Sequence, residues 1–212
     1  MKIVVLGSTG ATGKLVVEQA LALGHEVSAF ARNPADIKVQ HPKLTIVQGD
    51  SSVLATVEKA LVGADAVVSA LGTRTRAKST VRSDAARNVV AAMKKNGVRR
   101  VIWLSAAGVG DSLDQTKRAS FVFGRIIIPL LLKDVYADMA ASEVLIRQSG
   151  LENVVVRPVG LTDKPATKKV DATADLSAKV PGVGIPRADV AEFMLAQLTA
   201  NTWLSQSPVI WS

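Results

Sequence analysis

The chain has 212 residues with no cysteine, is 48% apolar and 4% aromatic, and carries a formal net charge of +8. This length suits one α/β domain, and the apolar share excludes a disordered chain or a coiled coil. Without cysteine the protein has no disulfides, Fe–S clusters or thiol nucleophiles, and its positive charge favours anionic ligands.

Short β-branched runs alternate with helical patterns along the whole chain. The runs are almost continuously apolar, which is typical of strands buried on both faces of a parallel sheet. They cover residues 2–6, 26–30, 44–47, 66–69, 100–104 and 153–157. Helical patterns cover residues 13–23, 80–95 and 135–149, and Pro186 opens a last helix. The alternation predicts a Rossmann-type, doubly wound parallel sheet in three α/β/α layers, formed as a single domain over residues 1–212.

Two segments do not follow this alternation. Residues 162–184 are rich in Lys, Asp, Ala and Gly and are weakly patterned, so we expect a substrate-side excursion, a candidate lid, rather than a second domain. Residues 121–132 form the longest apolar run, but they include Arg125 and Pro129 and are too few for the roughly 20 residues that span a bilayer. This run could pack in the core, form a wall for a flat substrate, or contact a second copy or a membrane surface.

Three glycines follow the first strand directly and open the first helix. Gly7 permits a tight turn, Gly10 lets the backbone approach a pyrophosphate, and Gly13 lets the helix pack closely. The free N–H groups at the helix N-terminus then face the phosphates. A P-loop is excluded, because Ser8 and Leu15 stand where it requires Gly and Ser or Thr. The pattern predicts a dinucleotide-binding loop made by Gly7, Thr9, Gly10, Ala11, Thr12 and Gly13.

The residue after the second strand indicates which dinucleotide binds. An NAD-specific fold ends this strand on Asp or Glu, which holds the ribose 2′-hydroxyl. Here the position is apolar and Arg32 follows it. Because a guanidinium binds a phosphate through two parallel hydrogen bonds, the sequence predicts NADP(H) as the cofactor.

Basic residues are concentrated between residues 74 and 100, where nine Lys or Arg accompany one Asp. They could form a solvated helix face or attract a phosphorylated cofactor. Nucleic-acid binding is a weaker alternative, because no aromatic residues are interleaved with the charges. The two histidines, His25 and His41, lie in short polar connections, so we expect no metal site and no Ser-His-Asp triad. The short apolar segment at residues 3–6 does not make a signal peptide, and we expect a cytoplasmic protein without a transmembrane segment.

These motifs resemble those of the atypical short-chain dehydrogenases/reductases, in their NmrA-like, NAD(P)-binding group. Within this group the chain is most similar to the flavin reductases, also called biliverdin-IXβ reductases. The matching stretches are residues 7–12, 31–32, 49–50, 71–74, 86–94, 105–106 and 187–195. The resemblance therefore covers essentially the whole chain, and the stretches at 71–74 and 86–94 are more specific than the glycine loop.

The resemblance implies further cofactor contacts at the carboxyl ends of the strands. Asp50 and Ser51 would lie at the adenosine, Leu104 beside the nicotinamide, and Pro158 would form a wall for that ring. Leu71, Gly72 and Arg74 would line the ribose and the diphosphate. Ser105 also lies beside the nicotinamide, and it is our predicted catalytic residue.

The chain also departs from the pattern of its relatives. The Tyr-x-x-x-Lys pair is absent, because Tyr136 is the only tyrosine and Ala140 stands where the lysine would be. Tyr136 is therefore a less favoured catalytic acid than Ser105. Asp36 replaces a second basic residue near the 2′-phosphate, and histidines of the relatives align with Met139 and Gly160.

The leading hypothesis is an NADPH-dependent oxidoreductase that transfers a hydride to a flat aromatic acceptor, such as a flavin, a quinone or a tetrapyrrole-like compound. The alternative is a non-catalytic NADP(H)-binding redox sensor of the NmrA-like type, which the missing Tyr-Lys pair favours. In either case we expect a monomer or homodimer that binds small molecules, without a metal and without nucleic acid.

Overall fold

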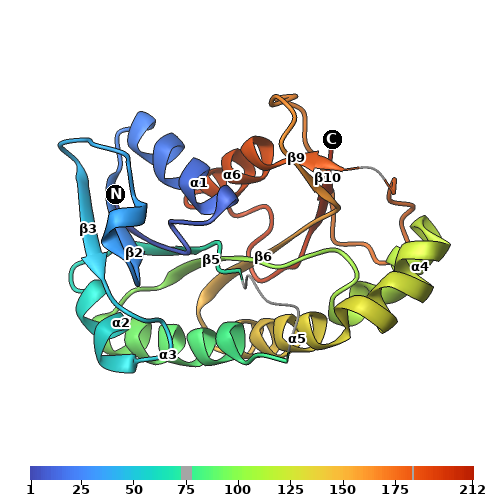
Figure 1. Cartoon of the computed structure of the whole chain (residues 1–212), viewed down its shortest axis with the longest axis horizontal. Helices are drawn as coiled ribbons and strands as arrows, with labels where there is room; N and C mark the ends of the chain where they lie inside the picture. Colours follow the sequence, from blue (N-terminus) through green and yellow to red (C-terminus); the bar gives the residue numbers. More distant parts are fainter. Residues whose placement is uncertain (73–77, 183) are drawn as a thin grey trace.

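The computed structural model describes residues 1–72, 78–182 and 184–212, and Figure 1 shows a sheet between two layers of helices. The strands of the sheet are β1 (Lys2–Leu6), β2 (Glu26–Ala31), β3 (Leu44–Gln48), β4 (Ala66–Ser69), β5 (Arg100–Leu104), β6 (Glu152–Pro158), β8 (Asp171–Thr173) and β10 (Val209–Trp211). Their order is β3-β2-β1-β4-β5-β6-β10-β8, and every neighbouring pair is parallel except β10 and β8. The first six strands follow the Rossmann order, as predicted.

Helices cover both faces of the sheet. Their bounds are α1 (Ala11–Ala22), α2 (Leu54–Ala60), α3 (Val81–Asn96), α4 (Leu113–Ala119), α5 (Lys133–Arg147) and α6 (Arg187–Ala196). Two short 3-10 helices, η1 (Pro34–Asp36) and η2 (Gly110–Ser112), and a π-helix, η3 (Phe123–Leu132), lie between them. In Figure 1, α1 and α6 cover one face, and α2, α3 and α5 cover the other. A separate pair of short strands, β7 (Leu161–Thr162) and β9 (Ile185–Pro186), lies near the start of α6.

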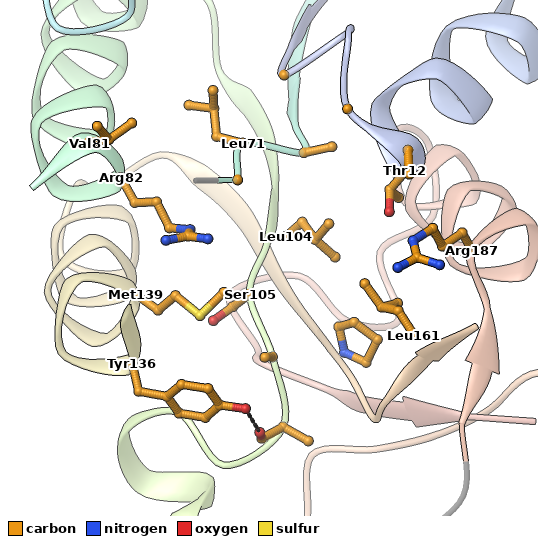
Figure 2. Close-up of a pocket in the computed structure, with 18 of the residues that line it drawn as sticks. Thr12, Leu71, Val81, Arg82, Leu104, Ser105, Tyr136, Met139, Leu161 and Arg187 are labelled. Atoms are coloured by element: carbon orange, nitrogen blue, oxygen red, sulfur yellow. Dashed lines mark hydrogen bonds between the residues drawn. The ribbon is translucent and has the colours of Figure 1, made fainter. Parts of the chain in front are cut away.

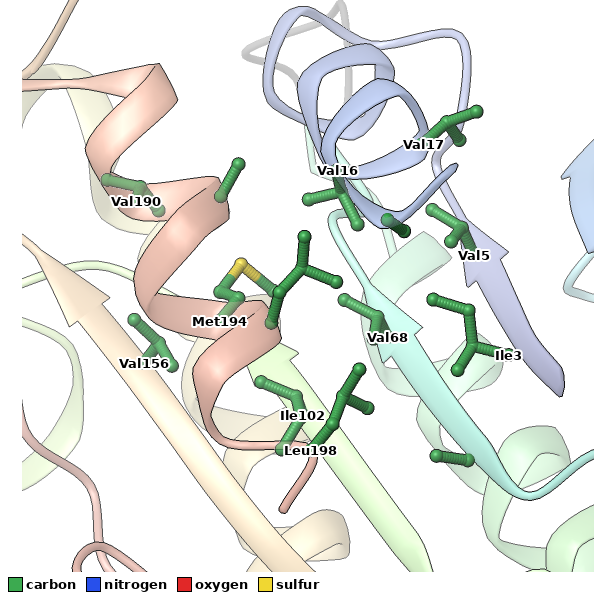
Figure 3. Close-up of a cluster of buried hydrophobic side chains, with 14 of the residues drawn as sticks. Ile3, Val5, Val16, Val17, Val68, Ile102, Val156, Val190, Met194 and Leu198 are labelled. Carbon is green, nitrogen blue, oxygen red and sulfur yellow. The ribbon is translucent and has the colours of Figure 1, made fainter. Parts of the chain in front are cut away.

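Alternate residues of the central strands face two separate cores. Ile3 and Val5 belong to the core under α1 and α6, whereas Val4 and Leu6 belong to the core under α2, α3 and α5. Figure 3 shows the first core, where Met194 of α6 lies against the apolar side chains of the strands. Because both faces are covered, both sets of side chains must be apolar, and this explains the continuous apolar runs.

The main elements confirm the predicted order, with small shifts at their ends. Helix α1 begins at Ala11 because Gly10 is its N-cap, and α3 ends where Gly97 adopts a left-handed conformation with φ of 71°. The sequence did not predict α2, α4 or the strands β7 to β10, which are short and carry little periodic pattern. None of the helices in the described part of the chain is long and apolar enough to cross a membrane.

The segment 162–184 is anchored to the domain near its middle. Its strand β8 pairs with β10 at the end of the main sheet. The side-chain amide of Gln115, on α4, donates hydrogen bonds of 3.1 Å to the carbonyls of Asp175 and Ala178. Val180 is buried. A lid motion of this segment stays a prediction. Such a motion would have to break the β8–β10 pairing or the hydrogen bonds of Gln115.

The core interpretation of the apolar run 121–132 is wrong for most of its residues. Leu130 is 74% exposed and Phe121 is 61% exposed, whereas Gly124 and Ile128 are buried. The run lies mainly in η3 rather than on the sheet, and Pro129 inside η3 cannot donate a regular helical hydrogen bond. One side of η3, with Gly124 and Ile128, therefore packs against the protein, whereas most of the run is exposed to solvent.

Candidate functional site

A large cleft follows the carboxyl ends of the parallel strands. Its volume is about 1780 Å³, and its walls are the loops after β1, β2, β3, β4, β5 and β6 together with parts of α3, α4, η3 and α5. Small-molecule pockets usually measure roughly 300–1,000 Å³. The cleft is therefore large enough for a dinucleotide and a second molecule at the same time.

The glycine loop forms one end of the cleft with little space to spare. Gly7 has a φ of +75°, and a Cβ there would lie 2.5 Å from the carbonyl oxygen of Ala70. A Cβ on Gly13 would lie 2.0 Å from the carbonyl oxygen of Gly7. At Gly10 the only close atom is that same oxygen, at 3.2 Å. Side chains are thus excluded at Gly7 and Gly13 by the protein itself, whereas Gly10 leaves space in the cleft.

The N-terminus of α1 offers hydrogen-bond donors to the cleft. Its N-cap is Gly10, and no side chain in the described part of the chain caps its first turn. Thr12 lies in this turn and faces the cleft in Figure 2. The Ser8 hydroxyl donates to the carbonyl of Phe30 at 2.9 Å and so fixes the loop to β2. Unpaired N–H groups at the positive end of a helix dipole suit a diphosphate, so these residues fit a dinucleotide.

Arg32 and Asp50 lie at the next part of the cleft, after β2 and β3. Arg32 is exposed, lines the cleft and has no carboxylate ion-pair partner among the described residues. Hydrogen bonds from the backbone and the hydroxyl of Ser52, together with the charge of Arg32, lower the pKa of Asp50. Ser51 is buried beside it, and its carbonyl accepts a hydrogen bond from Asn88 at 2.9 Å.

The sheet edge brings the remaining predicted residues together. Leu71 and Gly72, after β4, and Leu104 and Pro158, at the ends of β5 and β6, all line the cleft. Arg74 lies outside the described residues.

Ser105 lies at the centre of the cleft and is 4% exposed. Its N–H donates to the carbonyl of Val156 at 2.8 Å. Its hydroxyl oxygen is buried and has no hydrogen-bond partner in the described part of the protein. A buried hydroxyl without a partner costs free energy, so this group is available to a bound molecule.

Tyr136 lies in the same cleft but is not prepared for proton transfer. Its hydroxyl donates to the carbonyl of Ala107 at 3.3 Å, as the dashed line in Figure 2 shows. Burial raises the pKa of Tyr136 to about 12. Position 140 is alanine rather than lysine, so the next helical turn carries no positive charge that would lower this pKa.

Two arginines of the cleft received no individual role in the sequence interpretation. Arg187, at the start of α6, forms an ion pair of 2.6 Å with Asp163. Arg82, at the start of α3, is buried beside Asp138 of α5, although most other charges between residues 78 and 100 are on the surface. The helical pattern of α3 could not reveal this burial, because it results from the packing of α5 against α3.

Comparisons with known proteins identify relatives of the chain by sequence. The chain is 31% identical over 179 residues to an uncharacterised chloroplastic protein of Arabidopsis thaliana, covering 80% of this chain and 62% of that protein. It is 31% identical over 139 residues to the Arabidopsis divinyl chlorophyllide a 8-vinyl-reductase, covering 58% of this chain and 33% of the reductase. The chain thus spans less than two thirds of the length of either relative.

Solved structures share the whole fold. An anaerobillin reductase of Escherichia coli O157:H7 has a TM-score of 0.79 at 24% identity, covering 99% of this chain and 96% of that one. A short-chain dehydrogenase/reductase of Veillonella parvula, solved in complex with NADP, has a TM-score of 0.80 at 17% identity, covering 100% and 94%. Residues 7–201 match the sequence model of a family described as NAD(P)H-binding. The chain therefore belongs to the NAD(P)H-binding family, with the Rossmann fold and the NAD(P)-binding group that its motifs predicted.

Proposed function

We propose that the protein is an NADPH-dependent reductase that transfers a hydride to a flat aromatic acceptor, such as a flavin, a quinone or a tetrapyrrole-like compound. One observation carries this proposal. One cleft joins the glycine loop, which suits a dinucleotide, to a region where the Ser105 hydroxyl, without a hydrogen-bond partner among the described residues, lies among apolar side chains. Leu104, Met139 and Leu161 are among these side chains, and they suit a flat ring.

The cofactor-binding residues follow the cleft from one end to the other. The glycine loop and the first turn of α1 hold the diphosphate, Arg32 binds the 2′-phosphate, and Asp50 with Ser51 positions the adenosine. Leu71 and Gly72 contact the ribose and diphosphate, and Arg74, which lies outside the described residues, is assigned to the same groups from the family resemblance alone. Leu104, Ser105 and Pro158 surround the nicotinamide. The choice of NADPH over NADH rests on Arg32, because this guanidinium is free of carboxylate partners among the described residues.

When bound, the cofactor supplies the hydride, and the protein supplies orientation and exclusion of water. Two electrons and one proton pass to the acceptor in this step, and solvent provides the second proton of the reduced product. Ser105 donates a hydrogen bond to the acceptor or to the nicotinamide amide. Tyr136 stays protonated at neutral pH because its pKa is about 12, and it forms part of the wall.

The 31% identity to a protein named as a vinyl reductase supports reductase chemistry in this fold, although that similarity covers 58% of the present chain. A redox sensor is the second candidate. The Tyr-x-x-x-Lys pair is missing and the pKa of Tyr136 is raised, and both observations favour the sensor. Cofactor binding alone requires neither a Tyr-Lys pair nor a tyrosine that transfers a proton.

An NADPH-oxidation screen tests the proposal. Purified protein is incubated with NADPH or NADH and with flavins, quinones, biliverdin and small carbonyl compounds. We expect saturable oxidation of NADPH with at least one flat acceptor, and weaker activity with NADH. NADPH binding without oxidation by any acceptor would contradict the reductase and support the sensor.

A further inference from the structure

We infer that Arg82 binds an anionic group of the acceptor inside the cleft, so that the protein selects flat acceptors that carry a carboxylate, phosphate or sulfonate. This inference rests on the proposed function, because it assigns the acceptor region of that cleft. It adds a specificity residue to the proposed reaction.

Arg82 reaches the cleft from the first turn of α3. The residue is 6% exposed, and it lines the cleft. Figure 2 shows its guanidinium pointing from α3 towards the space beside Leu104, above Met139 and Ser105. The arginine is therefore a buried part of the cleft wall rather than a solvated surface charge.

Among the described residues, Asp138 supplies the carboxylate nearest to the Arg82 guanidinium, but the three hydrogen bonds that it accepts come from other groups. Its Oδ1 accepts the N–H of Ser83 at 3.0 Å and the hydroxyl of Ser83 at 2.7 Å. Its Oδ2 accepts the N–H of Arg82 at 3.0 Å. The N-cap residue Thr80 makes no side-chain capping bond, so Asp138 caps α3 from the neighbouring helix. This carboxylate mainly satisfies the backbone and the dipole of α3.

The guanidinium of Arg82 is consequently only partly neutralised. Its Nη1 lies 3.9 Å from Oδ2 of Asp138, which is too long for a hydrogen bond. Its Nε is buried and has no hydrogen-bond partner in the described part of the chain. Burial lowers the pKa of Arg82, but an arginine stays charged at neutral pH. A buried cation in the first turn of a helix is unfavourable unless an anion joins it.

A ligand oxyanion would satisfy this guanidinium through two parallel hydrogen bonds. The anion could come from the cofactor or from the acceptor. We assign it to the acceptor, because the glycine loop and the α1 N-terminus already supply the main donors to the diphosphate. Figure 2 shows Thr12 of this N-terminus on the other side of Leu104 from Arg82. Arg82 instead lies on the side of Met139 and Ser105, where the acceptor ring is expected.

The test measures equilibrium binding of oxidised acceptors to protein saturated with NADP⁺, so it requires no turnover. The acceptors are used in matched pairs: FMN against riboflavin, and a naphthoquinone with and without a carboxylate. Arg82→Met removes the charge, Arg82→Lys keeps a charge without the planar fork, and Arg87→Met is the control. Arg87 lies on the same helix but is exposed, pairs with Asp84 at 2.8 Å and does not line the cleft.

We expect Arg82→Met to weaken binding of the anionic acceptors by about tenfold to a hundredfold, the range of a charge-assisted hydrogen bond. Neutral acceptors and NADP⁺ should change by less than about twofold. Arg82→Lys should give an intermediate loss, and Arg87→Met no loss. Since Asp138 still caps α3 in Arg82→Met, and the buried charge is gone, the thermal stability of this variant should be no lower than that of the wild type.

Equal losses for charged and neutral acceptors would overturn the inference, as would a loss confined to NADP⁺, which would assign Arg82 to the cofactor. If Arg82→Met does not fold, the comparison of Arg82→Lys with Arg87→Met decides. Arg82→Lys should lose part of the wild-type preference for FMN over riboflavin, whereas Arg87→Met should keep it; an unchanged preference in Arg82→Lys would overturn the inference. The proposed reductase function fails separately, through the absence of NADPH oxidation.

Discussion

Ser105→Ala should make the free protein more stable and the enzyme less active. The Ser105 hydroxyl is buried and unpartnered in the described structure, and such a group costs about 1–3 kcal/mol. Alanine removes this cost and leaves a small void that offsets part of the gain. We therefore expect a net gain of about 1 kcal/mol, which raises the Tm of a domain of this size by about 2–4 °C.

The same hydroxyl is assigned a hydrogen bond to the acceptor or to the nicotinamide during hydride transfer. One such bond corresponds to a loss of about tenfold to a hundredfold in kcat/KM, or roughly 1.4–2.7 kcal/mol. The assays are thermal unfolding of the free protein and steady-state NADPH oxidation with the best acceptor of the screen. The two effects should have opposite signs, because a buried polar group without a partner is a functional feature that lowers stability.

Two results would refute this reasoning. A lower Tm in Ser105→Ala would show that the hydroxyl is already well bonded in the free protein. Unchanged kcat/KM, together with an inactive Tyr136→Phe variant, would move catalysis from Ser105 to the tyrosine.

Three further substitutions test other parts of the cleft. Tyr136→Phe should lower kcat/KM by less than about threefold, an effect below 1 kcal/mol. Burial raises the pKa of Tyr136 in the folded protein from 10 to about 12. The protonated tyrosine therefore contributes to stability below pH 10, and this contribution is lost as the pH rises towards 12. In denaturant unfolding, the free energy of unfolding of Tyr136→Phe should fall less between about pH 10 and 12 than that of the wild type. Arg32→Ala should weaken NADPH binding by roughly 1.5–3 kcal/mol and leave NADH binding nearly unchanged, as measured by calorimetry. Equal losses of affinity for the two cofactors would show that Arg32 does not bind the 2′-phosphate. Gly10→Val should fold but lose NADPH binding. A Cβ at Gly10 approaches only the Gly7 oxygen among the described atoms, and the rest of the side chain would enter the cleft. Retained affinity for NADPH would show that the glycine loop does not bind the diphosphate.

The sequence predicted the fold because the parallel sheet leaves a strong local signal. Strands such as β1 and β5 are apolar on both faces, and the glycine loop places Gly7 and Gly13 where Ala70 and Gly7 itself leave no space for Cβ atoms. Every predicted cofactor residue in the described part of the chain also lines the cleft or lies in its glycine loop. The carboxyl ends of parallel strands meet at one edge, so their positions follow from the topology.

The rest depends on contacts between distant segments. Arg82 and Asp138 are 56 residues apart, and nothing in either helix alone shows that the carboxylate caps the start of α3. For the apolar run 121–132 only the core alternative is wrong, because hydrophobicity does not specify which surface covers an apolar side chain. Only Gly124 and Ile128 of this run are buried, whereas Phe123 and Leu132 line the cleft.

A single-turnover experiment tests the central claim most directly. The protein is saturated with NADPH without oxygen and mixed with the best flat acceptor, while the nicotinamide absorbance is followed in time. The proposed function predicts that the bound NADPH is oxidised in one phase, and that deuterium at the transferred position of the nicotinamide slows this phase. Bound NADPH that stays reduced with every flat acceptor would contradict the proposed function.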